Sequence, residues 1–243
     1  SGIGVAVTRG EDVRVVSNTL SRTADTGVKV SQIDGLEISG NAITETAGIG
    51  IRVQDATEAT VNGNTVSENA FYGIVFRDVG QSETTAAASM MRSGAKWGLQ
   101  SATMGQNRYQ STLDLRWASQ LGLFLGYEET APVGIHNNTV QNTGRHGIIV
   151  NDSQRLSISE NLVDGNKDGV RLVNSTDLQV VENEIHHSVD EGLALGYTAE
   201  STIRGNNVTN SGTDGIYVVG AENELTNNTM AHNGDDGLDI QNK

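Results

Sequence analysis

Basic residues recur in the sequence at Lys29, Arg52 and Arg77, at intervals of 23 and 25 residues. Arginine binds carboxylates through two parallel hydrogen bonds, and flat aromatic rings stack on sugar faces. The pattern predicts a surface for an anionic sugar polymer. Its substrate-binding candidates are Lys29, Arg52, Arg77, Arg171 and Tyr197. In the alternative interpretation the surface carries mixed charge, and Arg52 pairs with Asp55 or Asp78.

A second set of residues is acidic, and each member directly precedes a glycine. Its members are Asp168, Glu191, Asp214 and Asp236, at intervals of 22 or 23 residues. Stacked carboxylates about 5 Å apart repel one another unless a cation compensates them. Because Ca²⁺ accepts carboxylate oxygens in flexible geometry, a calcium site along this row is one hypothesis. No organic cofactor is expected. The alternative is a solvated turn in which each acid begins a turn before glycine and discourages edge pairing.

These residues must be positioned by the repeat on which their spacing depends. The repeat is marked by glycines at Gly4, Gly27, Gly50, Gly73, Gly98, Gly122, Gly147, Gly169, Gly192, Gly215 and Gly237. The residue after each of these glycines is aliphatic, and an Asn-x-apolar triplet follows later in most repeats. Such a fixed period of 20 to 50 residues is typical of solenoids.

Within each repeat, apolar residues alternate with polar ones over three to five positions, which predicts short strands. One such unit cannot bury its own apolar edge, so copies must stack through parallel strand pairing. The sequence therefore predicts one all-β domain over residues 1–243, a single-stranded right-handed parallel β-helix of about ten coils of 22–25 residues. Residues 80–135 hold either two degenerate coils or a loop-rich segment. The recurring glycines are interpreted as close-packed backbone positions and the asparagines as an inward hydrogen-bonded ladder.

Composition excludes several classes of function. The 243 residues include 29 glycines, one proline and no cysteine, with a formal net charge of −14. A nucleic-acid partner is not expected, because neutralising phosphates requires a basic surface. The sequence has no apolar run long enough for a membrane span. Without cysteine there is no disulfide framework and no thiolate metal site.

One stretch, NTGRHGIIV at 142–150, is similar to a basic-His-Gly sequence of mannuronan C5-epimerases, and AHNGDDGLDI at 231–240 resembles a turn of the same family. NosD-like repeat proteins are a more distant resemblance. In those epimerases the basic residue and histidine line the substrate groove, which implies a role for Arg145 and His146. C5 epimerisation or β-elimination needs a base for the C5 proton and a cation for the carboxylate. The catalytic candidates are His146, Tyr127 and Arg145. The family's Asp-Pro-His-Asp/Glu motif is absent, so enzymatic activity stays open.

Two functions follow from these observations. In the first, the protein binds and modifies, as an epimerase or lyase, an acidic extracellular polysaccharide such as alginate along the groove of the first strands. In the second, it is a non-enzymatic scaffold, adhesin or fibre segment. The sequence indicates no capping helix at either end. We therefore expect the protein to be a fragment of a longer chain, or an oligomer formed end to end or side by side. The expected location is secreted, periplasmic or at the cell surface.

Overall fold

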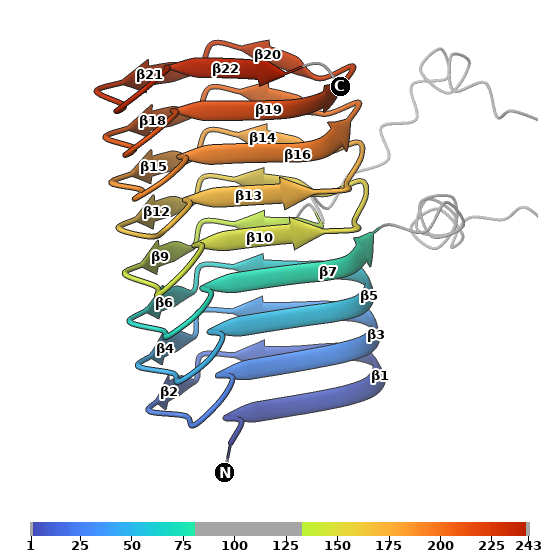
Figure 1. Cartoon of the computed structure of the whole chain (residues 1–243). Coiled ribbons are helices and arrows are strands. Elements are labelled where there is room, and N and C mark those ends of the chain that lie inside the picture. Colours follow the sequence, from blue (N-terminus) through green and yellow to red (C-terminus); the bar gives the residue numbers. More distant parts are fainter. Residues whose placement is uncertain (1, 81–132, 242–243) are drawn as a thin grey trace, which may run out of the picture. The chain divides into compact units, whose positions relative to one another are not determined.

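The computed structural model of the protein describes residues 2–80 and 133–241, which form a parallel β-helix with no helical segment (Figure 1). The all-β solenoid predicted from the repeat is confirmed. Each coil supplies three strand segments, and every pairing between coils is parallel. In the described part of the chain no helix is long and apolar enough to cross a membrane.

The first segment of each coil begins directly after a repeat glycine. These strands are β1 (Val5–Val16), β3 (Val28–Ser39), β5 (Ile51–Asn62), β7 (Ile74–Gly80), β10 (Ile148–Asn151), β13 (Val170–Val173), β16 (Leu193–Ala199), β19 (Ile216–Ala221) and β22 (Leu238–Gln241). In β1, β3 and β5 the same strand continues through the second segment. In later coils the second segment is a separate strand: β8 (Gly134–His136), β11 (Ser157–Ser159), β14 (Gln179–Val181), β17 (Thr202–Arg204) and β20 (Glu224–Thr226).

The third segments form a sheet of their own. It contains β2 (Thr19–Ser21), β4 (Ala42–Thr44), β6 (Thr65–Ser67), β9 (Thr139–Gln141), β12 (Leu162–Asp164), β15 (Glu184–His186), β18 (Asn207–Thr209) and β21 (Thr229–Ala231), in that order. The stack therefore has about eight coils, and β22 begins one more. The other two segments make up a 14-stranded sheet.

The predicted count of ten coils is wrong because strands on either side of residues 81–132 pair directly. β7 pairs with β10, placing Ile74 beside Ile148, and β5 pairs with β8. No coil stands between these neighbours. Gly98 and Gly122, which the sequence suggested as corners of two degenerate coils, lie outside the described residues.

The interior is filled by the side chains at the first and third positions after each glycine. In β5 and β7 these are Ile51, Val53, Ile74 and Phe76, all fully buried. The same two positions are at most 3 % exposed from β10 through β19. β-Branched and other aliphatic side chains suit the flat pleated surface of a strand, so the sequence alternation predicted this core correctly.

The repeat glycines are required by packing. A Cβ atom at Gly147 would lie 2.5 Å from Cγ1 of Val163 and 2.7 Å from the carbonyl oxygen of Gly169. Comparable contacts occur at Gly50 and Gly192. Since no real Cβ tolerates these distances, the glycine lets the coil turn tightly against its own third segment and the next coil.

The recurring asparagines form the predicted inward ladder. Asn138 is 1 % exposed, and its backbone N–H and side-chain amide both donate to Oδ1 of Asn161 at 3.0 Å. Asn161 donates in the same way to Asn183 at 3.1 and 2.9 Å. The ladder also runs from Asn64 to Asn138 across the undescribed segment. It satisfies buried polar groups at a corner of every coil, so it holds successive coils in register.

Candidate functional site

The outward side chains of the first segments form one continuous row, because adjacent strands pair residue by residue. Its members, in order from β3 to β22, are Lys29, Arg52, Val75, Ile149, Arg171, Ala194, Tyr217 and Asp239. Neighbouring members are separated by about 4.8 Å, the spacing of paired strands. We call this the first-strand face. The pairing of β7 with β10 brings Arg52 and Arg171 onto one surface, with only Val75 and Ile149 between them.

The basic end of the first-strand face is hollowed. A depression of about 240 Å³ is lined by residues that include Lys29, Arg52 and Asp55. Nη2 of Arg52 donates to Oε1 of Gln54 at 2.8 Å, two residues along the same strand. The predicted cations Lys29 and Arg52 thus border one hollow, whose floor lies on β3 and β5.

Asp78, one of the two acids considered as partners of Arg52, lies instead beside Arg77. Nε of Arg77 lies 3.7 Å from Oδ2 of Asp78, its sequence neighbour. Asp55 and Asp78 both have φ of 52°, the left-handed conformation. Aspartate adopts this conformation more readily than most residues, so both acids suit the place within β5 and β7 where the regular strand pairing is interrupted. Arg77 lies beside Asn151 of β10.

A second row runs along the corner that precedes the first strands. Each member's carbonyl accepts a hydrogen bond from the glycine N–H of the preceding coil, at 2.9 to 3.2 Å. The row contains Tyr72, His146, Asp168, Glu191, Asp214 and Asp236, on successive coils. We call it the corner row. The predicted acidic series is therefore continued by the predicted catalytic histidine.

His146 and Arg171 both contact one buried carboxylate. Oδ2 of Asp168 lies 2.8 Å from Nδ1 of His146 and 2.9 Å from Nη1 of Arg171. The Asp168 side chain is 1 % exposed, against 14 % for His146 and 43 % for Arg171. Nδ1 of His146 has no hydrogen bond of regular geometry, although it lies beside this carboxylate. The arrangement directs Nδ1 toward the carboxylate and leaves Nε2 for another partner.

The two neighbouring carboxyl groups of the corner row differ in acidity. Burial alone would raise the pKa of Asp168, but His146 and Arg171 outweigh burial and hold the pKa below its ordinary value. Burial raises the pKa of Glu191, and the negative neighbours Asp168 and Asp190 raise it further. Asp168 thus gives up its proton more readily than an ordinary aspartate, whereas Glu191 holds its proton more readily than an ordinary glutamate.

Aromatic side chains flank the histidine. The ring of Tyr72 stacks on His146 with centroids 5.6 Å apart and an interplanar angle of 12°. Phe71 lies beside Tyr72, and the guanidinium carbon of Arg145 is 5.7 Å from the Phe71 ring centre. Arg145 is exposed, and its contact with Phe71 turns it to the outside of the corner. Sequence reasoning missed Tyr72. The available signal was its place directly before Gly73, which matches that of His146 before Gly147.

Part of the predicted metal row converges. Asp168, Asp190 and Glu191 each offer an oxygen, and these atoms all lie within 4.8 Å of one another. Asp190 also lies 3.2 Å from Nζ of Lys167. The group of three does not include Asp214 or Asp236, where the backbone N–H of Asp236 donates to Oδ1 of Asp214 at 3.0 Å. Calcium binding at this corner stays a prediction.

Of the two predicted tyrosines, Tyr197 is described, and it is not brought to the histidine. Tyr197 is 66 % exposed and has φ of 56°, at the far end of its strand β16 from Glu191. Tyr127 lies outside the described residues.

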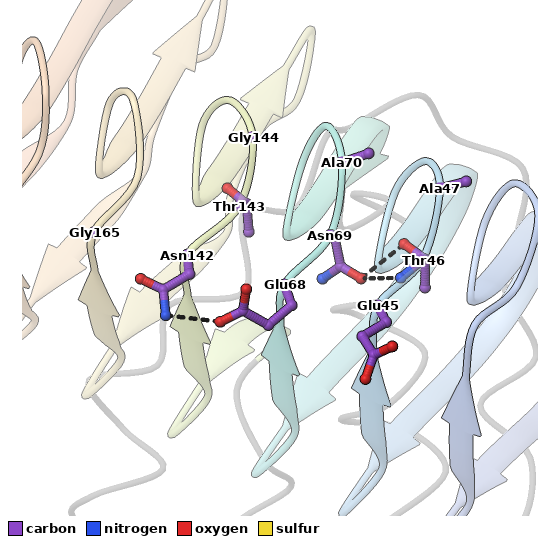
Figure 2. Close-up of a pocket in the computed structure, with 10 residues that line it drawn as sticks. All are labelled: Glu45, Thr46, Ala47, Glu68, Asn69, Ala70, Asn142, Thr143, Gly144 and Gly165. Carbon is purple, nitrogen blue, oxygen red and sulfur yellow. Dashed lines mark hydrogen bonds between the residues drawn. The ribbon is translucent and has the colours of Figure 1, made fainter.

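A larger hollow lies on another corner, after the third segments, and Figure 2 shows its lining. Its volume is about 540 Å³. Asn142 donates to Oε1 of Glu68 at 2.9 Å, and Thr46 donates to Oδ1 of Asn69 at 2.7 Å. Glu45 is held by Arg22 at 2.9 Å. The polar side chains of this hollow thus pair with one another between coils, and it contains none of the predicted site residues.

The His146 corner has the parts that proton transfer next to a carboxylate requires. A histidine is oriented by a buried acid, and a partly exposed arginine adjoins it. Proton abstraction beside a carboxylate needs a base, together with a cation that neutralises the developing charge. Asp168 serves both groups, because its single charge positions the imidazole and the guanidinium.

A sequence family described as "Right handed beta helix region" matches residues 1–86 and 121–243. No curated protein matches the chain. Among solved structures, the periplasmic alginate epimerase AlgG matches with a TM-score of 0.65 and 14 % identity, over 94 % of this chain and 48 % of that one. The A-module of the mannuronan C-5 epimerase AlgE4 of Azotobacter vinelandii matches with a TM-score of 0.55 and 14 % identity, over 95 % and 69 %.

The enzymatically active domain of tailspike protein 2 of bacteriophage CBA120 matches with a TM-score of 0.56 and 8 % identity, over 98 % of this chain and 39 % of that one. At these identities the likeness shows a shared fold. The present chain spans about half the length of the periplasmic alginate epimerases.

Proposed function

The chain belongs to the right-handed β-helix family, and on that premise we propose that it binds an acidic polysaccharide, of the polyuronate class, across its first-strand face. The observation that carries this proposal is the direct pairing of β7 with β10. It unites Lys29 and Arg52 with Arg171 in one row, although they lie far apart in the sequence. The similar structures include an alginate epimerase and a mannuronan epimerase, whose polymers are of this class.

The row has the chemistry that a polyuronate requires. Carboxylates spaced along a sugar chain can meet cations repeated from coil to coil, as solenoids commonly present their binding residues. Arg171 keeps free N–H donors after pairing with Asp168, because a guanidinium has five. Val75 and Ile149 are only 8 and 7 % exposed and provide an apolar floor between the arginines.

We further propose that His146 is the proton-transfer residue and Arg171 the carboxylate-neutralising residue of an epimerase or lyase reaction. Nε2 of His146 takes the C5 proton, and the guanidinium of Arg171 balances the charge that develops on the carboxylate. A proton from water, delivered to the opposite face of C5, gives the epimer, and His146 then releases to water the proton that it took. If the C4–O bond breaks instead, the leaving oxygen takes a proton from water, and the product is an unsaturated uronate with a C4–C5 double bond.

Titration with oligouronates tests the binding proposal. The double substitution Arg52→Gln and Arg171→Gln should weaken binding, and raising the salt concentration should weaken wild-type binding. Arg204→Gln is a suitable control, because Arg204 lies on β17 in a second segment and pairs with Glu182 at 3.7 Å. Equal effects of the double variant and the control would contradict the proposal.

Incubation with polymannuronate, polygalacturonate and hyaluronan in deuterium oxide tests the catalytic proposal. Epimerase activity would appear as deuterium at C5, and lyase activity as ultraviolet absorbance of unsaturated products. His146→Gln should abolish either signal. The matched control is His187→Gln, because Nδ1 of His187 lies 2.8 Å from Asp164, the same distance as in the His146 pair, but on an exposed corner. Bound polymer without either signal would favour the non-enzymatic scaffold.

A secreted, periplasmic or cell-surface location is part of the same proposal. Its support is that the similar alginate epimerase AlgG is periplasmic. Acidic polysaccharides of this kind are also encountered outside the cytoplasm, which fits the expected substrate.

A further inference from the structure

The first-strand face changes charge along its length. Its cations stand on β3, β5 and β13, at Lys29, Arg52 and Arg171. Beyond β13 the described members of the face are Ala194, Tyr217 and the acid Asp239. Between Arg204 and the end of the described residues the sequence contains six acidic residues and no lysine or arginine.

Three acids belong to the last two described coils, one in the first-strand face and two in the corner row. Asp239 directly follows Tyr217 on the first-strand face, through the pairing of β19 with β22. Asp214 and Asp236 are the last two members of the corner row. The two rows adjoin one another, because Arg171 of the face reaches Asp168 of the corner row at 2.9 Å. An anionic chain lying along the face would therefore meet all three acids after passing Arg171.

No described cation compensates these acids as Arg171 compensates Asp168. Oδ1 of Asp214 accepts a hydrogen bond from the backbone N–H of Asp236, and Asp239 accepts one from Gln241 at 3.1 Å. Neither contact neutralises a carboxylate. All three side chains are solvent-accessible, since Asp236 is exposed and Asp214 and Asp239 are partly so. Their charges thus act outward, on whatever approaches the face.

Resting on the proposed function, we propose that Asp214, Asp236 and Asp239 are specificity-determining residues that end the polyuronate site at about β16. The site is consequently one-sided. Carboxylates are held from β3 to β13 and repelled from β19 and β22. Added sugar units beyond those that the cationic strands hold contribute no affinity, because each would place a carboxylate beside an acid. Like charges at the separation of adjacent coils repel appreciably even in water.

The test compares oligouronates of defined length, a tetramer and a decamer, in low salt and without divalent cations. The variant carries Asp214→Asn, Asp236→Asn and Asp239→Asn, and asparagine at 214 keeps the oxygen that accepts the Asp236 N–H. Removing each charge should strengthen decamer binding about two- to threefold, and all three together about tenfold, while tetramer binding changes less than about twofold. The difference should vanish in high salt, because these charges are exposed.

A second triple variant controls for net charge. Glu160→Gln, Glu184→Gln and Glu224→Gln remove three acids from other faces, since Glu184 and Glu224 lie on the third and second segments β15 and β20. This control should leave the ratio of decamer to tetramer affinity unchanged. If the two triple variants behave alike, or if the first strengthens both oligomers equally, the proposed boundary is wrong while the binding site stands. If wild type binds neither oligomer, the proposed function fails and the boundary with it.

Discussion

Asp168 is the residue whose replacement tests most sharply how the His146 corner is built. Asp168→Asn keeps the shape of a side chain that is 1 % exposed but removes its charge. The substitution leaves the guanidinium of Arg171 without the carboxylate that lies 2.9 Å away, and His146 without the one at 2.8 Å. The protein should therefore lose stability, and His146 should lose its fixed orientation.

The size of the loss follows from the exposure of the two partners of Asp168. Removing one member of a buried ion pair costs about 3 to 5 kcal/mol, because the remaining charge is left uncompensated. The Arg171 side chain is 43 % exposed, so water compensates part of its charge. An exposed pair contributes at most about 1 kcal/mol. Between these limits, we expect Asp168→Asn to lower the free energy of unfolding by about 2 kcal/mol at neutral pH.

The same substitution should show a defined pH dependence. Burial opposes ionisation of Asp168, yet His146 and Arg171 hold its pKa below the ordinary value. A carboxyl group whose pKa is depressed on folding stabilises the protein fully above its unfolded pKa of roughly 4. This stabilisation disappears as the pH falls through the lower, folded pKa. The stability difference between wild type and Asp168→Asn should thus be largest at neutral pH and shrink below about pH 4.

Urea unfolding followed by circular dichroism, repeated from pH 7 down to pH 3, measures both effects. Asp164→Asn is the control, because Asp164 lies 2.8 Å from Nδ1 of His187 but the pair is exposed, at 35 and 65 %. It should cost less than about 0.5 kcal/mol. Equal losses in the two variants, or a loss for Asp168→Asn that stays constant down to pH 3, would refute the reasoning.

Three further predictions concern the ladder, the corner glycines and the metal. Asn161→Ala removes the acceptor of two donors of Asn138 and should cost about 3 kcal/mol in urea unfolding, whereas Asn18→Ala, at the exposed first rung, should cost less than about 1 kcal/mol. Gly147→Ala should lower the free energy of unfolding by at least about 2 kcal/mol. Gly196→Ala should change it by no more than about 0.5 kcal/mol, because no heavy atom lies closer than 3.8 Å to the new Cβ. Millimolar Ca²⁺ should raise the thermal midpoint of wild type but not of Glu191→Gln, since binding to the folded state stabilises it; an equal shift in both proteins would argue against calcium at this corner.

The fold was predictable from sequence because its causes are local and repeated. Alternation with a period of two, a glycine such as Gly147 and an asparagine such as Asn161 recur in every regular coil. Each of these three features therefore indicates the same inward contact in many coils. The count of coils was not predictable, because Gly98 and Gly122 continue the spacing of the repeat. Spacing alone does not reveal that β7 pairs with β10 instead of with the segment that follows it.

The contacts of the His146 corner differ in how far the sequence could predict them. His146 and Asp168 precede glycines of adjacent coils, so their proximity was available from the sequence, although they were assigned to separate features. Tyr72 precedes His146 in the corner row only when residues 81–132 are left out of the stack. The pairing of Arg171 with Asp168 depends on rotamers and on burial, which residue spacing does not determine.

Amide hydrogen exchange with and without a bound oligouronate tests the central claim most directly, because it locates the ligand on the molecule. The proposed site predicts added protection in peptides that contain β3, β5, β7, β10 and β13, together with the corner at His146. Peptides containing β14, β17 and β20, which form the second segments, should exchange as in the free protein. Protection confined to these second segments, or no change anywhere at saturating ligand, would contradict the assignment of polysaccharide binding to the first-strand face.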